Sequence, residues 1–389
     1  MPASPVEAPL FPPLGPRGQH GLINDIQVLR AVAIACVLVQ HSWFNLFFQQ
    51  EWLTTLLRHV PLWCGVDLFL VISGYVITTS LLPGITARLP ARLVLGRFWI
   101  RRAFRIWPAS WFWLAMMLLG SFLFTNPAFL GTPELNAKGG LAGVFGYANI
   151  RFASRPMMPY GASFPYWSLS LEEQFYVLLP PLMLLARRHI GWLALLALAI
   201  QFPLPHPRMY FFFRNDGLLW GVALASIPAL ARWARPAASA VARVPLAGWA
   251  ILLAAIGEMA RLSPFFEQSP PYLIGAMAAV AAVPVWLASA DRDLFAAGPL
   301  QGAALWMGSR SYALYLCHVP LYQCAAAFAR FMAETDPVVA AHTDLFATLL
   351  AVPLLAGAAE FTYRCVEQPL RRKGVALAKN FGAPATAPL

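Results

Sequence analysis

Apolar runs about as long as a bilayer core is thick recur along this chain, and they restrict it to a membrane protein. A transmembrane helix needs roughly 20 mostly apolar residues. Only 12% of the 389 residues are charged, about half of the roughly 25% that is usual for soluble domains. The predicted fold class is therefore all-α, a polytopic transmembrane helical bundle of about ten helices. We place its spans at 25–48, 62–82, 106–125, 166–186, 190–204, 210–229, 246–260, 272–289, 305–330 and 343–366.

The basic residues indicate an orientation for these spans. Lys and Arg collect in cytoplasmic loops, and ten crossings with both termini inside place most arginines there. We therefore predict a multi-pass protein of the inner (plasma) membrane with both termini cytoplasmic. Residues 139–150 are expected to be a re-entrant or peripheral segment, because an eleventh crossing would turn the later basic loops outward. The net charge of +11 then follows from membrane orientation, and no nucleic-acid partner is expected.

Three regions are expected along the chain. Residues 1–22 are rich in proline and predict a flexible N-terminal tail, 23–370 form one transmembrane domain, and 371–389 form a basic, loosely ordered C-terminal tail. No cleavable signal peptide is visible, so the first helix is expected to direct insertion. The five cysteines include no CxxC pair and are interpreted as small apolar packing residues. We expect no metal.

Charged and polar residues enter several of the predicted spans, where each costs at least a few kcal/mol. Arg30 and His41 lie eleven residues apart on the first span, close to three helical turns, so they share one face about 16 Å apart. Acidic residues occur at a similar depth on three other spans, and this agreement predicts a polar cavity rather than isolated hydrogen bonds between helices. These acidic residues are Asp67, Glu172, Glu173 and Asp216.

A histidine in such a cavity suits acyl transfer. An imidazole beside a carboxylate can take a proton from a hydroxyl, while the carboxylate fixes the tautomer. No GxSxG serine is present, so the simplest route is direct attack by an acceptor hydroxyl with His41 as general base; an acyl-histidine intermediate is the alternative. The oxyanion donor is expected to be Arg30, Tyr75 or a backbone N–H. His318 on the ninth span either lines the cavity or makes an interhelical hydrogen bond.

A cluster of arginines precedes the third span. The stretch from Arg88 to Arg105 alternates basic and apolar residues at helical spacing, which predicts an amphipathic helix at the membrane interface. Arg102 and Arg105 are three residues apart and therefore lie on one face of the helix. This spacing suits the binding of phosphates by charge and hydrogen bonds. The alternative is an ordinary cytoplasmic anchor. Beneath a polar cavity, the pair predicts a phosphate-bearing donor that enters from the cytoplasm.

Five segments together resemble the acyltransferase family 3 membrane proteins, which acylate, most often O-acetylate, envelope polysaccharides and similar acceptors. The resemblance covers about residues 24 to 370, so 23–370 would be a transmembrane acyltransferase domain. The segments are LRAVAIACVLVQH, GVDLFLVISGYVIT, FWIRRAFRIWP, YWSLSLEEQFYVLLP and SYALYLCHVPLY.

This resemblance implies acetyl-CoA, or another acyl-CoA, as the donor. It implies that His41 is the catalytic histidine, that Arg30 is its partner in the motif, and that Arg102 and Arg105 meet the nucleotide of the donor. The expected catalytic residues are His41, Arg30, Glu172, Glu173 and Asp67. The expected donor-binding residues are Arg101, Arg102 and Arg105. The expected acceptor-binding residues are Trp167, Ser168, Asp216, Tyr315 and His318.

The leading hypothesis is an integral membrane acyltransferase that acetylates a hydroxyl of a carbohydrate or other envelope acceptor. The alternative is a multi-span transporter or flippase of envelope glycans or lipid-linked intermediates, although no inverted repeat is visible. Some members of the family carry an extra extracytoplasmic hydrolase-like domain, for which the residues after 370 are too few. Where an acceptor needs that domain, a separate extracytoplasmic transferase partner is expected.

Overall fold

Helices form all the regular secondary structure that the computed structural model describes, which covers residues 24–46, 51–124, 130–154, 161–204, 212–262, 272–296 and 298–382. The all-α fold class is confirmed. The expected tail 1–22 lies outside the described residues. The main helices are α1 Asn24–Asn45, α2 Glu51–His59, α3 Cys64–Thr86, α4 Ala91–Leu123, α6 Pro133–Val144, α7 Ala148–Ser154, α8 Tyr166–Ala186, α9 Ile190–Gln201, α10 Asp216–Ser226, α11 Pro228–Ala242, α12 Ala247–Leu262, α13 Leu273–Ala288, α14 Gln301–Ser309, α15 Ser311–Ala333, α16 Pro337–Ala341, α17 Thr343–Phe361 and α18 Gln368–Asn380.

Several helices are long and apolar enough to cross a bilayer, which supports a multi-pass membrane protein. Five helical stretches within the described residues meet that condition, or six if a bent pair is counted as one span, so the number ten stays a prediction. The five stretches are Asn24–Ser42, Cys64–Thr86, Ala91–Leu123, Tyr166–Gln201 and Thr343–Asn380.

Some predicted spans differ in detail from the observed helices. The run 210–229 is divided, because the chain bends by 85° between α10 and α11, where Ile227 is extended and Pro228 lacks an N–H. The run 305–330 is divided at Arg310 into α14 and α15. The interfacial helix expected before the third span is continuous with it, since α4 runs unbroken for 33 residues.

Residues 139–150 and residues 371–380 also contain helices. Helix α6 has 12 residues, about 18 Å at 1.5 Å per residue, and Gly146 at φ 65° separates it from α7. Residues 371–380, which we expected to be loosely ordered, belong to α18. That helix packs along α4, with Gly374 against Phe104. This tertiary contact orders the helix, and the composition of the segment alone does not reveal it.

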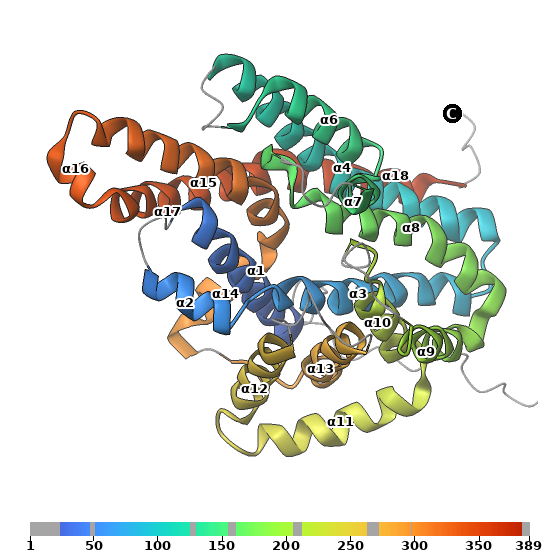
Figure 1. Ribbon diagram of the computed structural model, residues 1–389. Coiled ribbons are helices and arrows are strands. Elements are labelled where there is room, and N and C mark those ends of the chain that lie inside the picture. The colour runs from blue at the N-terminus through green and yellow to red at the C-terminus, as the bar shows by residue number, and fades with distance from the viewer. Residues whose placement is uncertain are drawn as a thin grey trace, which may run out of the picture.

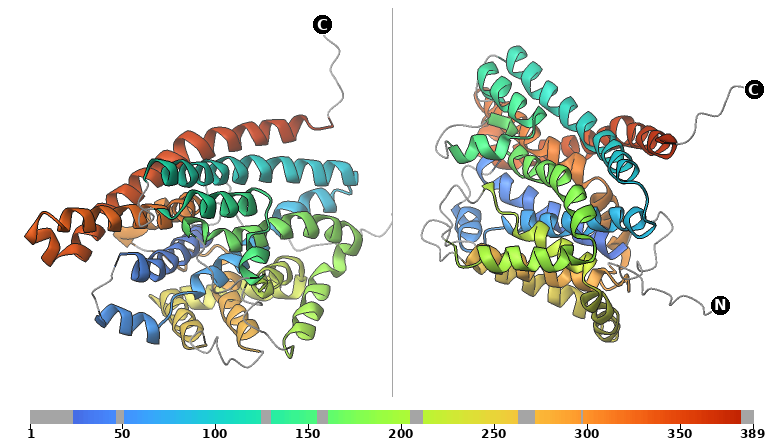
Figure 2. Two further views of the ribbon diagram at one scale, coloured as in Figure 1. Left: turned by 45° about the horizontal axis from the view of Figure 1, so that its top comes forward. Right: turned by 90° about the vertical axis from the view of Figure 1, so that its right-hand side faces the viewer.

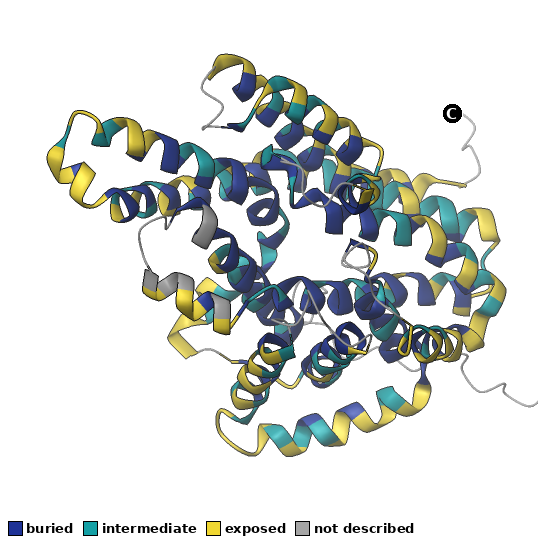
Figure 3. Ribbon diagram, in the orientation of Figure 1, coloured by how far each residue is buried: buried dark blue, intermediate teal, exposed yellow. Residues whose placement is uncertain are grey.

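The middle of the bundle is built from α1, α3 and α10, and Figure 1 shows α1 and α3 surrounded by the other helices. Figure 3 shows these helices as mostly buried, whereas the outer faces of α6, α11 and α16 are exposed. The two views of Figure 2 place the α15–α17 hairpin and the α4–α18 pair together above α1. Two of these central helices, α1 and α3, line the pockets described below.

Helices α3 and α10 approach each other so closely that glycine is required between them. A Cβ atom added to Gly221 would lie 2.3 Å from the carbonyl oxygen of Val71, and one added to Gly74 would lie 2.2 Å from that of Leu218. Real Cβ atoms do not approach backbone atoms so closely. The contact fixes the position of α10, and of the residues just before it, against α3.

Candidate active site

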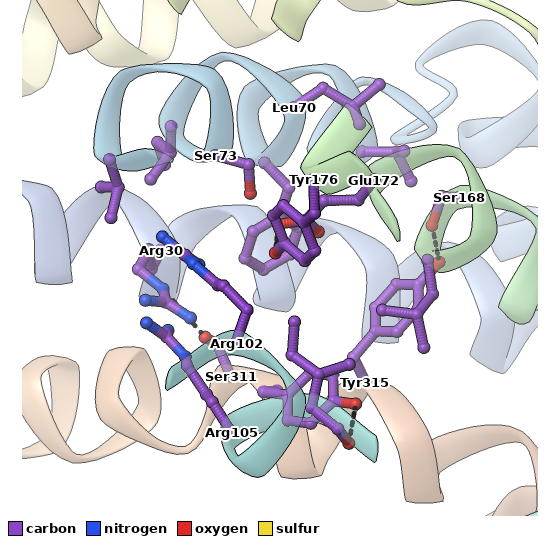
Figure 4. Close-up of a pocket in the computed structure, with 17 residues that line it drawn as sticks. Arg30, Leu70, Ser73, Arg102, Arg105, Ser168, Glu172, Tyr176, Ser311 and Tyr315 are labelled. Atoms are coloured by element: carbon purple, nitrogen blue, oxygen red, sulfur yellow. Dashed lines mark hydrogen bonds between the residues drawn. The ribbon is translucent and has the colours of Figure 1, made fainter. Parts of the chain in front are cut away.

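A pocket opens among α1, α3, α4, α8 and α15. We call it the arginine pocket, because three arginines line it, and Figure 4 shows their guanidinium groups gathered on one side. Apolar side chains from α3 and α4 complete its walls. Its polar lining residues are Arg30, Ser73, Arg102, Arg105, Ser168, Glu172, Tyr176, Ser311, Tyr312 and Tyr315.

The arginines are held by contacts from different helices. Nε of Arg30 donates a hydrogen bond to Oγ of Ser311 at 3.2 Å, and the guanidinium of Arg102 lies 4.9 Å from the ring centre of Tyr176. Arg105 lines the pocket one turn farther along α4. Arg101 does not belong to the lining residues. The structure thus brings Arg30 together with Arg102 and Arg105, whereas the sequence had associated Arg30 with His41.

Acidic groups balance part of this charge. Glu172 lines the same pocket, its carboxylate accepts a hydrogen bond from the Tyr176 hydroxyl, and it attracts Arg30 and Arg102 electrostatically. Glu367, which is 9% exposed, lies at the end of a π-helical turn, Thr362–Glu367, and interacts with Arg105 and Arg30. Three arginines face one lining carboxylate, so the pocket suits a polyanion.

A second, much narrower pocket contains His41. We call it the histidine pocket. Val66 and Tyr315 line both pockets, so these two side chains form the boundary between them. The Tyr315 hydroxyl is fixed there by Ser168 Oγ at 2.7 Å and by the carbonyl oxygen of Pro165 at 2.9 Å, and Figure 4 shows the contact with Ser168. The lining residues are Val37, Gln40, His41, Leu62, Trp63, Val66, Phe164, Trp167, Arg214 and Tyr315.

A short hydrogen-bond chain determines which nitrogen of His41 carries its proton. Nδ1 of His318 lies 2.8 Å from the carbonyl oxygen of Tyr315, which can only accept, so this nitrogen is protonated. In a neutral ring, Nε2 of His318 is then an acceptor, and Nδ1 of His41, 2.8 Å away, must donate to it. His41 therefore presents a basic Nε2, the state that a general base requires.

His41 is hydrogen-bonded to another imidazole, that of His318, and the described partners of three expected carboxylates are other groups. Asp67 forms an ion pair with Arg214 at 3.4 Å, and Asp216 accepts a hydrogen bond from Gln201 at 2.8 Å. Glu173 lines a separate, largely apolar groove beside α4 and α8. The expectation compared only how deep these carboxylates lie in the membrane. It did not take into account the side of each helix on which they lie.

Three of the five expected acceptor-binding residues line the two pockets, and Asp216 and His318 line neither. Trp167 lines the histidine pocket, Ser168 lines the arginine pocket, and Tyr315 lines both. His318 is fully buried. Of the two interpretations of His318, the structure supports the interhelical hydrogen bond, and its partner is the candidate base His41.

Sequence reasoning missed several polar residues of these pockets, among them Ser311 of the arginine pocket and Gln40 and Arg214 of the histidine pocket. Arg214 carries a detectable signal, since it is a charge in the apolar stretch FFFRNDGLLWG. Gln40 and Ser311 carry none, because uncharged polar residues are common between helices. Within the described residues, no group of three or more His, Cys, Asp or Glu side chains could hold a metal ion.

Most of the chain matches one known protein family. The model of an acyltransferase domain, that of acyltransferase family 3, matches residues 23–358. The chain belongs to this family. The match includes α1, which carries Arg30 and His41, and α15, which carries Tyr315 and His318. The family resemblance of the five segments is thereby confirmed.

Relatives within acyltransferase family 3 are named for O-acetylation. The chain is 25% identical to the peptidoglycan O-acetyltransferase OatA of Listeria monocytogenes, over 90% of this chain and 56% of that protein. It is 27% identical to the O-acetyltransferase OatA of Staphylococcus aureus, over 89% of this chain and 57% of that protein. The chain thus spans about half the length of the curated relatives it matches. No solved structure matches it.

Proposed function

We propose that this protein transfers an acetyl group from acetyl-CoA to a hydroxyl of an envelope carbohydrate. The observation that carries the proposal is the adjacency of two pockets, one with three arginines and one with a histidine whose tautomer suits a general base. Family membership and the names of the relatives support acetyl as the group and peptidoglycan as the first acceptor to test.

The arginine pocket suits the donor. Its guanidinium groups can pair with the phosphates of CoA through charge-assisted hydrogen bonds. The pantetheine arm would then pass between Val66 and Tyr315 to bring the thioester beside His41. With the predicted orientation, the donor enters from the cytoplasm and the acceptor from the opposite side of the inner membrane.

The acceptor sugar would meet the base at the histidine pocket. Trp63, Phe164 and Trp167 give this pocket aromatic walls, and aromatic faces offer an apolar surface on which a sugar ring can lie. Nε2 of His41 takes the proton of the acceptor hydroxyl while its oxygen attacks the thioester carbon. The C–S bond then breaks, and the leaving thiolate takes the proton from the imidazolium.

The decisive assay is thiol release by purified protein in lipid nanodiscs with acetyl-CoA and peptidoglycan fragments. We expect free CoA thiol to accumulate only when both substrates are present, and fragments to gain the mass of acetyl groups. Transport of labelled glycans into vesicles without thiol release, across peptidoglycan, other envelope glycans and lipid-linked sugars, would instead favour the flippase hypothesis.

Donor recognition is tested at Arg102. Arg102→Gln should raise the KM for acetyl-CoA about tenfold to a hundredfold, because a hydrogen bond to a charged group contributes about 1.5–3 kcal/mol. Arg101→Gln is the matched control, since it removes the same charge from the neighbouring position of α4 without altering the pocket lining. Equal KM values for the two variants would contradict the assignment of the arginine pocket to the donor.

A further inference from the structure

The histidine pocket contains a buried hydrogen-bond donor that the proposed steps do not yet use. Gln40 is 1% exposed and lines this pocket beside His41. Its Oε1 accepts a hydrogen bond from the backbone N–H of Leu62 at 2.5 Å. This contact fixes the orientation of the amide, because a backbone N–H must face the oxygen and not the NH₂ group.

The other end of that amide has no hydrogen-bond partner among the described residues. Nε2 of Gln40 is buried and unsatisfied, although leaving such a donor unpaired costs about 1–3 kcal/mol. Buried polar groups are nearly always paired, so an exception beside a catalytic base needs an explanation. In a substrate pocket, a group of the bound substrate would satisfy this donor.

A positive charge lines the same pocket. The guanidinium of Arg214 is 1% exposed, forms an ion pair with Asp67 at 3.4 Å and lies 5.2 Å from the ring centre of Trp167. Asp67 lies in the first turn of α3 and Arg214 just before α10. Because Gly74 and Gly221 lock these two helices together, the guanidinium is held in place before substrate binds.

We propose that Gln40 and Arg214 form the oxyanion site of the acetyl transfer, an inference that rests on the proposed function. When the acceptor oxygen bonds to the thioester carbon, the carbonyl π electrons move to its oxygen. Nε2 of Gln40 donates a hydrogen bond to that oxyanion, and Arg214 stabilises its charge. The carbonyl re-forms as the C–S bond breaks, and the thiolate takes the proton held by His41.

The two other side chains considered for this role lie elsewhere. Arg30 lines the arginine pocket, on the far side of Val66 and Tyr315, and Tyr75 belongs to the lining of neither pocket. An oxyanion donor must lie next to the attacked carbon. The base lies in the histidine pocket. Apart from His41 and the two tryptophans, the lining residues with side-chain N–H donors are Gln40 and Arg214.

The test compares Gln40→Met with Gln27→Met in the nanodisc assay. Gln27 is also buried on α1 but lines neither pocket, so it reports the general effect of losing a buried amide. Removing one oxyanion donor lowers kcat about 10²- to 10³-fold. We expect Gln40→Met to do so with every acceptor tested, with little change in the KM for acetyl-CoA, and Gln27→Met to retain a kcat near that of the unaltered protein.

Arg214 is tested in the double variant Asp67→Asn with Arg214→Gln, because removing Arg214 alone would leave a buried carboxylate without its ion pair. The folded double variant should bind acetyl-CoA normally and have a reduced kcat. A kcat for Gln40→Met equal to that of Gln27→Met would overturn the oxyanion site. Absence of thiol release from the unaltered protein with every acceptor would instead overturn the proposed function.

Discussion

Replacing His41 with alanine is expected to lower kcat for acetyl transfer about 10³-fold, the middle of the range of roughly 10²–10⁴ that a general base contributes. The imidazole is 5% exposed, so buffer bases have little access to replace it. The KM for acetyl-CoA should change little, because the arginine pocket lies beyond Val66 and Tyr315. Thiol release under saturating acetyl-CoA measures the first effect, and its concentration dependence measures the second.

Two further histidines serve as controls for this experiment. His59→Ala should have no effect, since His59 is exposed on α2 and contacts its own helix. His318→Ala should lower kcat about tenfold, because it leaves the base but removes the group that fixes its tautomer. If His318→Ala abolished activity while His41→Ala kept most of it, the general base would be His318 and the order of the hydrogen-bond chain would be reversed.

Gly221→Ala is expected to have the largest effect on stability. The added methyl group would meet backbone atoms of α3 at 2.3 and 2.4 Å, and a helix backbone cannot move aside as a flexible side chain can. Overpacking usually costs about 1–3 kcal/mol and occasionally more. We expect a lower thermal unfolding temperature in detergent, measured by size-exclusion chromatography after heating, and less folded protein in the membrane.

Gly257→Ala is the matched control for that substitution. A Cβ atom at Gly257 meets nothing within 4 Å, and alanine is the better helix former by about 0.8–1 kcal/mol. The control should therefore unfold at the same temperature as the unaltered protein or slightly higher. Similar unfolding temperatures for both variants would show that α3 and α10 can separate without cost, and the rigid support of Arg214 would no longer hold.

Features with a local cause could be predicted from the sequence. Apolar runs gave the helical class, because a bilayer admits few other structures. The spacing of Arg102 and Arg105 predicted that both would line one pocket, since residues three apart share a helix face. His41 was identified from its depth in an apolar run, where a polar residue is costly and so draws attention.

Features that depend on how helices meet could not be predicted. The pairing of His41 with His318 joins residues 277 positions apart, and the pairing of Asp67 with Arg214 depends on a close approach that glycines permit. The amide of Gln40 is oriented by the backbone N–H of Leu62, and the residues next to Gln40 in the sequence do not indicate this contact. The helix break at Pro228 was not predicted, and its 85° angle depends on what each half packs against.

The hydrogen-bond chain from His41 through His318 ends on the peptide oxygen of Tyr315, which cannot pass a proton onward. In the proposed reaction, the proton gained by His41 therefore leaves with the departing thiol. Each turnover then moves one acetyl unit outward and one hydrogen inward, and no net charge crosses the bilayer. Acetylation of this kind is electroneutral, so the membrane voltage would neither drive it nor oppose it.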